Sequence, residues 1–153
     1  RGDLKWFAQA LHDLGNKVHD MDADDFRLGI VTSAVVPTVD TVAPHWGGTG
    51  TTNFATSQVS TAGTAYTGPI VLAVEQWVLA AGGPQFRVTT DLSIAQDASG
   101  FANGAWAIIY NNTDVSKRAI GFIDLAGPLG NTANPISGIW NGVNKVALTL
   151  TQA

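Results

Sequence analysis

Two apolar runs rich in aromatic and β-branched side chains, residues 106–110 and 120–125, flank a polar stretch at residues 111–117. Such runs favour extended strands, whereas the polar stretch is too hydrophilic to continue a buried strand. The pattern predicts a β-hairpin with a long loop. This pattern constrains the fold and does not indicate a chemical function.

Further strands are expected on both sides of this hairpin. The runs with the required composition are residues 26–33, 70–79, 86–94 with a break near Asp91, and 145–150 after an Asn141-Gly142 turn. Residues 34–69 contain Pro37, Pro44, Pro69 and the flexible loop 47–50, so they predict long loops with one short strand at 54–60. We expect neighbouring subunits to order these loops, and the hairpin to belong to the chain's own core.

The N-terminal segment predicts a single helix. Residues 3–18 repeat apolar side chains at helical spacing, with Asp3 as N-cap and Gly15-Asn16 as the end. Its apolar stripe would pack on the sheet or on a neighbouring subunit. One helix followed by seven or eight strands predicts a mainly β fold, an antiparallel β-sandwich of jelly-roll type. We expect one domain over residues 1–153, with the helix at about 3–18 and the sandwich at about 26–153.

Charged residues make up only 13% of the chain, and 45% is apolar. This charge content is about half that of an ordinary soluble protein, which suggests that a partner covers part of the surface. A homodimer or homotrimer would satisfy this requirement. The net charge of −4 argues against nucleic acid as a partner, and no apolar run has the length of a membrane span. We therefore expect a soluble chain, unprocessed apart from an initiator Met.

No recognisable set of catalytic, cofactor-binding or metal-binding residues occurs in the sequence. The absence of cysteine excludes disulfides and thiol catalysis. The acidic stretch 19–25 matches a calcium loop at three positions, but the template fails at its Gly and Glu positions. A connector with solvated carboxylates is the preferred interpretation, with a weak surface calcium site as the alternative. His12 and His19 lie two helical turns apart, which is too far for one metal ion.

Several short motifs follow one another in a fixed order. They are the N-terminal helix, the Asp-rich turn 19–25, the strand 26–33, the Gly-x-x-Tyr segment 63–66, and the hairpin motifs 107–111 and 121–124. In this order they resemble the capsid decoration, or cement, proteins of tailed bacteriophages. The resemblance covers most of residues 3–125. The chain departs from the family after Tyr66, where Thr67-Gly68-Pro69 stands in place of a frequent Gly-Gly pair.

The resemblance implies a virion protein without enzymatic activity or cofactor. It would be made in the host bacterial cytoplasm, bind the major capsid protein on the outer capsid surface, and stabilise the shell by bridging neighbouring subunits. The residues expected at the interface are Phe7, Leu11, Leu14, Trp46, Phe54 and Tyr66.

Three alternatives remain open at this point. A carbohydrate-binding jelly roll, such as a virion-surface lectin, would need two or more exposed aromatic residues beside Asp or Asn, and Trp46 is the one tryptophan expected to be exposed. A hydrolase would have to start from a solvent-exposed His45 near Asp40. Another structural protein of the phage head or tail is the third.

Overall fold

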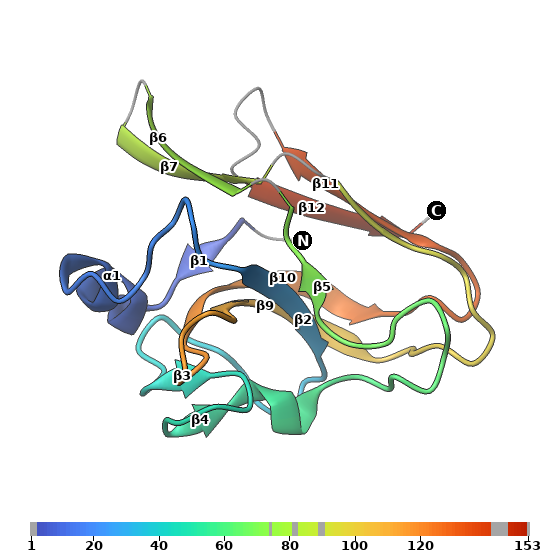
Figure 1. Ribbon diagram of the computed structural model, residues 1–153. Coiled ribbons are helices and arrows are strands. Elements are labelled where there is room, and N and C mark those ends of the chain that lie inside the picture. The colour runs from blue at the N-terminus through green and yellow to red at the C-terminus, as the bar shows by residue number, and fades with distance from the viewer. Residues whose placement is uncertain (1–2, 74, 81–82, 89–90, 142–146, 153) are drawn as a thin grey trace.

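A computed structural model describes residues 3–73, 75–80, 83–88, 91–141 and 147–152. The fold is mainly β, with 39% strand and 9% helix. Its elements, in chain order, are β1 (Lys5–Trp6), α1 (Ala8–Gly15), β2 (Phe26–Val31), β3 (Pro44–His45), β4 (Thr52–Asn53), the 3₁₀ helix η1 (Phe54–Ser57), β5 (Ile70–Val71), β6 (Glu75–Ala80), β7 (Gly83–Val88), β8 (Leu92–Ile94), β9 (Gly104–Asn111), β10 (Ala119–Leu129), β11 (Ile136–Asn141) and β12 (Ala147–Gln152) (Figure 1).

The predicted hairpin is confirmed as the pair β9–β10, and it forms the middle of the largest sheet. This sheet has five antiparallel strands in the order β1-β10-β9-β2-β5. In its register Ile108 lies opposite Phe122 on one side and Gly29 on the other. The C-terminal hairpin is also confirmed, as β11 paired with β12, whereas its Asn141-Gly142 turn extends outside the described residues.

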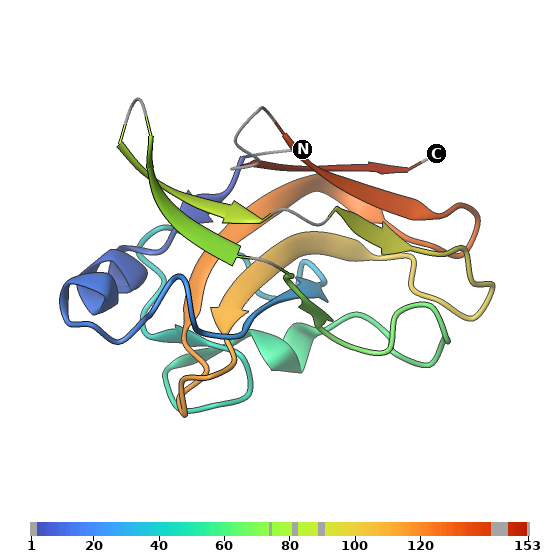
Figure 2. The same ribbon diagram turned by 45° about the horizontal axis from the view of Figure 1, so that its top comes forward.

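Both faces of the five-stranded sheet are covered (Figures 1 and 2). The β6–β7 hairpin and the sheet β12-β11-β8 lie over one face, while β3, β4 and η1 lie against the other. Trp6 packs edge-on against Trp77 and Phe86 on the first side, and Phe7 stacks on Phe54 on the second. Because both faces are buried, β2 and β9 are almost continuously apolar and do not alternate.

The antiparallel, mainly β class is therefore confirmed, but the jelly-roll sandwich is not. The sheets are small and several, with five, three, two and two strands, and β3–β4 is a parallel pair. The expected strand 70–79 is divided into β5 and β6, and the break near Asp91 separates β7 from β8 as predicted. Where a strand was expected at 54–60, residues 54–57 form η1 and Gln58 makes an isolated antiparallel bridge to Val31.

The helix is shorter than its sequence pattern indicates. Lys5 and Trp6 pair with β10, so the chain is extended where the first helical turn was expected. Phe7, not Asp3, is the N-cap, and no side chain caps the helix there. The end at Gly15 agrees with the prediction, and Lys17 then adopts a left-handed conformation with φ of 58°.

Residues 44–59 and Tyr66 pack largely on the chain itself, which corrects for them the expectation that neighbouring subunits order residues 34–69, whereas Val36, Val39 and Val42 of the same segment are exposed. The Trp46 ring stacks on Tyr110, with centroids 5.3 Å apart and planes 5° apart. A Cβ on Gly48 would lie 2.1 Å from the backbone oxygen of Ser116, so the Gly-rich loop is held against the β9–β10 turn. Its glycines permit close approach and do not mark a flexible loop.

Candidate binding site

A buried carboxylate lies at the junction of α1 and the turn that precedes β10. Asp13 is 4% exposed. Gln9, one turn earlier, donates a hydrogen bond from Nε2 to Asp13 Oδ1 over 2.9 Å. The exposed His12 approaches the same oxygen, with Nδ1 3.4 Å away. The partners of Asp13 Oδ1 therefore come from the helix itself.

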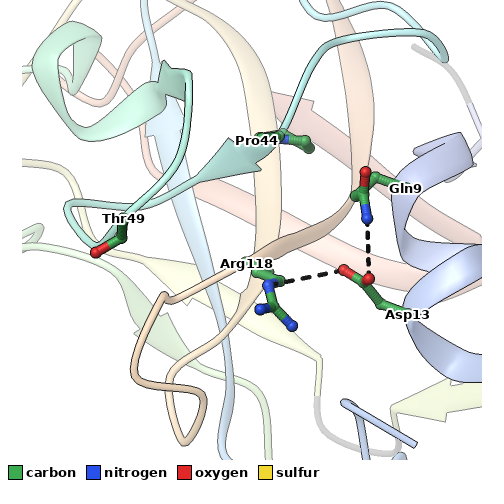
Figure 3. A pocket seen from close by; sticks show the side chains of 6 residues that line it. Gln9, Asp13, Pro44, Thr49 and Arg118 are labelled. Atoms are coloured by element: carbon green, nitrogen blue, oxygen red, sulfur yellow. Dashed lines mark hydrogen bonds and ion pairs between the residues drawn. The ribbon is translucent and has the colours of Figure 1, made fainter. Parts of the chain in front are cut away.

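The other oxygen, Asp13 Oδ2, faces Arg118 (Figure 3). The Arg118 Nε lies 3.8 Å from this oxygen and 3.7 Å from Asp114 Oδ2, so one guanidinium is shared between two carboxylates. Both distances exceed that of a hydrogen bond. Asp13 Oδ2 is buried and receives no hydrogen bond from the described residues.

Asp13 is one of the residues that line a cavity of about 140 Å³, which we call the polar pocket. It is lined by Gln9, Asp13, Ala43, Pro44, Thr49 and Arg118. Three segments that are far apart in the sequence meet here: α1, the segment around β3, and the residue preceding β10 (Figure 3). One carboxylate, one guanidinium, one amide and one hydroxyl make up its polar lining, which suits the binding of a small polar group.

A second buried polar group, His19, lies close to this junction. Its Nδ1 is 3.0 Å from Asn111 Nδ2, and Asn111 also donates to Asp24 Oδ2. Burial lowers the pKa of His19 below its ordinary value of 6.5, although the charges of Asp13, Asp114 and Asp24 act to raise it. His19 Nε2 is buried and has no hydrogen-bond partner among the described residues.

The acidic stretch is more structured than the predicted connector with solvated carboxylates. Asp24 accepts from Asn111 and from the backbone of Asp20, and Asp22 accepts from the backbone of Trp77. Burial acts to raise the pKa of Asp25, but hydrogen bonds from Arg27 and Asn112 outweigh it and lower that pKa. Within the described ranges, no three His, Asp or Glu side chains are placed to hold a metal ion.

Beside this stretch lies an open hollow of about 400 Å³, which we call the Trp77 hollow. It is lined by Leu14, Lys17, His19, Asp20, Met21, Asp22 and Trp77. A single aromatic residue thus lies next to two carboxylates. No local pattern predicts this arrangement, because β6 and the acidic stretch are distant in the chain.

Four of the six residues expected at an interface belong to the chain's own core. Phe7, Trp46, Phe54 and Tyr66 are between 0% and 6% exposed. They are therefore packing residues in this structure, and Trp46 is not the exposed stacking residue that was expected. Leu11 is 58% exposed and Leu14 is half-buried. An interface role for these two leucines stays a prediction.

Tyr66, in the Gly-x-x-Tyr segment, holds the loop to the central sheet. Its hydroxyl accepts a hydrogen bond from the backbone N–H of Ile30 over 3.0 Å. Burial raises the pKa of Tyr66 to about 12. His45 is buried as well, at 3% exposure, so the solvent-exposed His45 that a hydrolase would need is not present.

Three exposed apolar side chains come from two segments that lie against each other, and we call them the apolar face. Leu11 is on α1, while Val39 and Val42, 46% and 65% exposed, are in the loop before β3. The backbone N–H of Ala8 donates to the Val39 oxygen over 2.9 Å, which joins the loop to the start of the helix. Neither valine could be predicted as exposed from the sequence, because both lie in a Pro-containing loop without periodicity.

Comparison of the chain with protein families, curated protein sequences and solved structures found no match. Among the described residues, no helix has the length and apolar character needed to span a membrane.

Proposed function

We propose that this chain is a structural virion protein, without enzymatic activity, that binds the outside of a tailed-bacteriophage capsid. It would contact the major capsid protein as a homodimer or homotrimer and stabilise the shell by bridging neighbouring subunits. The order of motifs along residues 3–125 supports this proposal, because it resembles that of decoration proteins.

The structural observation that best supports the proposal is the apolar face. Leu11, Val39 and Val42 expose apolar surface on a chain with only 13% charged residues. Partly exposed aliphatic residues that are grouped on adjoining segments mark interaction surfaces more often than scattered ones do. A permanent protein partner would remove this apolar surface from water.

The direct test is co-sedimentation of the purified protein with heads that lack decoration protein. We expect the wild-type chain to sediment with the heads, and Val42→Asp to weaken this binding by about tenfold or more, because it places a charge in the contact. Leu79→Asp is the matched control, since Leu79 is 87% exposed on β6, outside the apolar face. Equal binding of the two variants would rule out the apolar face as the contact.

A carbohydrate-binding module is the second candidate, and the Trp77 hollow favours it. Sugars stack on aromatic rings and donate hydroxyl groups to carboxylates, and Trp77, Asp20 and Asp22 line this hollow together. The hollow provides one aromatic residue, whereas the criterion set from the sequence was two. A glycan-array signal that Trp77→Ala abolishes, with no sedimentation on heads, would replace the capsid proposal by this one.

A further inference from the structure

We infer that the acidic stretch 19–25 is held by a pH-sensitive contact: protonation of His19 breaks its hydrogen bond with Asn111 and releases residues 19–24 from the turn between β9 and β10. This turn comprises residues 112–118. The contact belongs to the chain itself and needs no capsid partner. Its basis is Asn111, a fully buried residue at the end of β9.

The side-chain amide of Asn111 is held in one orientation. Its Oδ1 accepts hydrogen bonds from the backbone N–H groups of Thr113 over 2.9 Å and Asp114 over 3.1 Å. Its Nδ2 carries two hydrogens. One is donated to Asp24 Oδ2 over 2.6 Å, and the other points to His19 Nδ1 over 3.0 Å. Turning the amide over would place Nδ2 against two backbone donors, so this orientation is fixed.

The orientation of Asn111 determines the protonation state of His19. Because Asn111 Nδ2 is a donor, His19 Nδ1 must be the acceptor, and the single proton of the neutral ring lies on Nε2. A second proton would have to bind at Nδ1, where it would face the Asn111 donor across 3.0 Å. Two donors repel each other. The charged imidazolium ring and this contact with Asn111 therefore exclude each other.

The charged groups around His19 determine the direction of the pH dependence. Burial has the largest effect and lowers the pKa of His19 below 6.5. Asp13 on α1, Asp114 on the turn and Asp24 on the acidic stretch act to raise this pKa, and Arg118 on the turn acts to lower it. The Trp77 hollow, which His19 also lines, adds the exposed side chains of Lys17, Asp20 and Asp22. The contact is therefore complete at neutral pH and is lost as the pH falls through the lowered pKa.

The released segment ends at Asp25, which is held to the turn independently of His19. The Asp25 backbone N–H donates to Thr113 Oγ1 over 2.8 Å, and the Asp25 carbonyl accepts from the Asn112 N–H over 2.7 Å. Burial acts to raise the pKa of Asp25, but hydrogen bonds from Arg27 and Asn112 lower it, so this carboxylate stays charged in mild acid. Residues 19–24 carry four of the seven side chains that line the Trp77 hollow. The hollow therefore has its described shape only while His19 is neutral.

An NMR titration of the wild-type chain, downward from about pH 7.5 until it unfolds, tests the contact directly. We expect the side-chain amide signals of Asn111 to shift with the same midpoint as the His19 ring, below about pH 6.5. The backbone N–H of Trp77, which donates to Asp22, should shift with them. The Ile108 signal in the central sheet should stay in place. Titration of His19 without a change at Asn111, or loss of the Ile108 signal before His19 titrates, would overturn the inference.

One pair of variants tests the Asn111 donor. Asn111→Asp keeps an acceptor for the turn and replaces the donor that faces His19 by an acceptor. It should raise the midpoint of His19 by about one pH unit or more, since a carboxylate favours the charged ring. Asn103→Asp adds the same charge to an exposed residue beyond the other end of β9, and should leave the midpoint unchanged. Equal shifts in both variants, or no shift in either, would contradict the role of Asn111.

A second pair still tests the inference if Asn111→Asp does not fold. His19→Gln retains a hydrogen-bond acceptor that does not titrate. The Asn111 side-chain signals should therefore keep their neutral positions until the chain unfolds. His12→Gln removes an exposed histidine from α1 and should behave as the wild type. An Asn111 shift that persists in His19→Gln would show that another group drives the release, and would overturn the assignment to His19.

Discussion

Single glycines allow neighbouring layers of the fold to approach each other closely, and Gly29 in β2 is the clearest case. A Cβ at this position would lie 2.2 Å from the Trp46 ring, which is itself stacked on Tyr110. The tryptophan therefore cannot move away from the strand without losing its contact with Tyr110. The absence of a side chain at Gly29 is a requirement for covering this face of the sheet.

We expect Gly29→Ala to lower the free energy of unfolding by about 1 to 3 kcal/mol, because a methyl group must be forced against a fixed ring. Gly15→Ala is the matched control: it adds the same methyl group at the end of α1, where nothing lies within 4 Å. Alanine favours helix over glycine, so this variant should be neutral or more stable by up to about 1 kcal/mol. Urea unfolding of the two variants measures the difference, and similar losses in both would contradict the packing described for Trp46.

At the scale of elements, local sequence patterns predicted the helices and strands that have a local signal, but not those that depend on long-range contacts. The hairpin β9–β10, the strand β2 and the C-terminal hairpin each have their signal within a short stretch of sequence. The strand β1 has no such signal, because the helical spacing of apolar residues continues through Lys5 and Trp6, and only pairing with β10 keeps them extended. Secondary structure that depends on a distant partner overrides the local preference.

Because the helix starts later than its sequence pattern indicates, the expected stability cost of substitutions in its apolar stripe changes. The apolar stripe Phe7, Leu11, Leu14 suggests equal burial, but Phe7 precedes the helix and contacts Phe54 and Phe122, whereas Leu11 faces away from the core. Phe7→Ala should cost about 3 to 5 kcal/mol. Leu11→Ala should cost no more than about 0.5 kcal/mol, since exposed substitutions change stability little. Chemical denaturation of both variants checks this order, and a large loss for Leu11→Ala would mean that α1 is packed differently.

At the scale of the whole molecule, polar groups from three separate segments converge at one junction. Asp13 comes from α1, His19 and Asp24 from the following connector, and Arg118 from the turn before β10. Neither the polar pocket nor the burial of His19 could be predicted from the sequence, because each residue has an ordinary polar neighbourhood in the chain. Their common environment exists only after the central sheet has brought these segments together.

This junction predicts a loss of stability in mild acid. Burial lowers the pKa of His19 below 6.5 in the folded protein, against the opposing charges of Asp13, Asp114 and Asp24. As the pH falls below about 6.5, the unfolded chain binds a proton at His19 that the folded chain does not, so the free energy of unfolding decreases until the folded pKa is passed. His19→Gln should reduce this slope between about pH 7.5 and pH 5.5. His12→Gln, a change at an exposed histidine on α1, is the control and should retain it. Melting temperatures across this range measure the effect, and an unchanged slope in His19→Gln would show that another group titrates there.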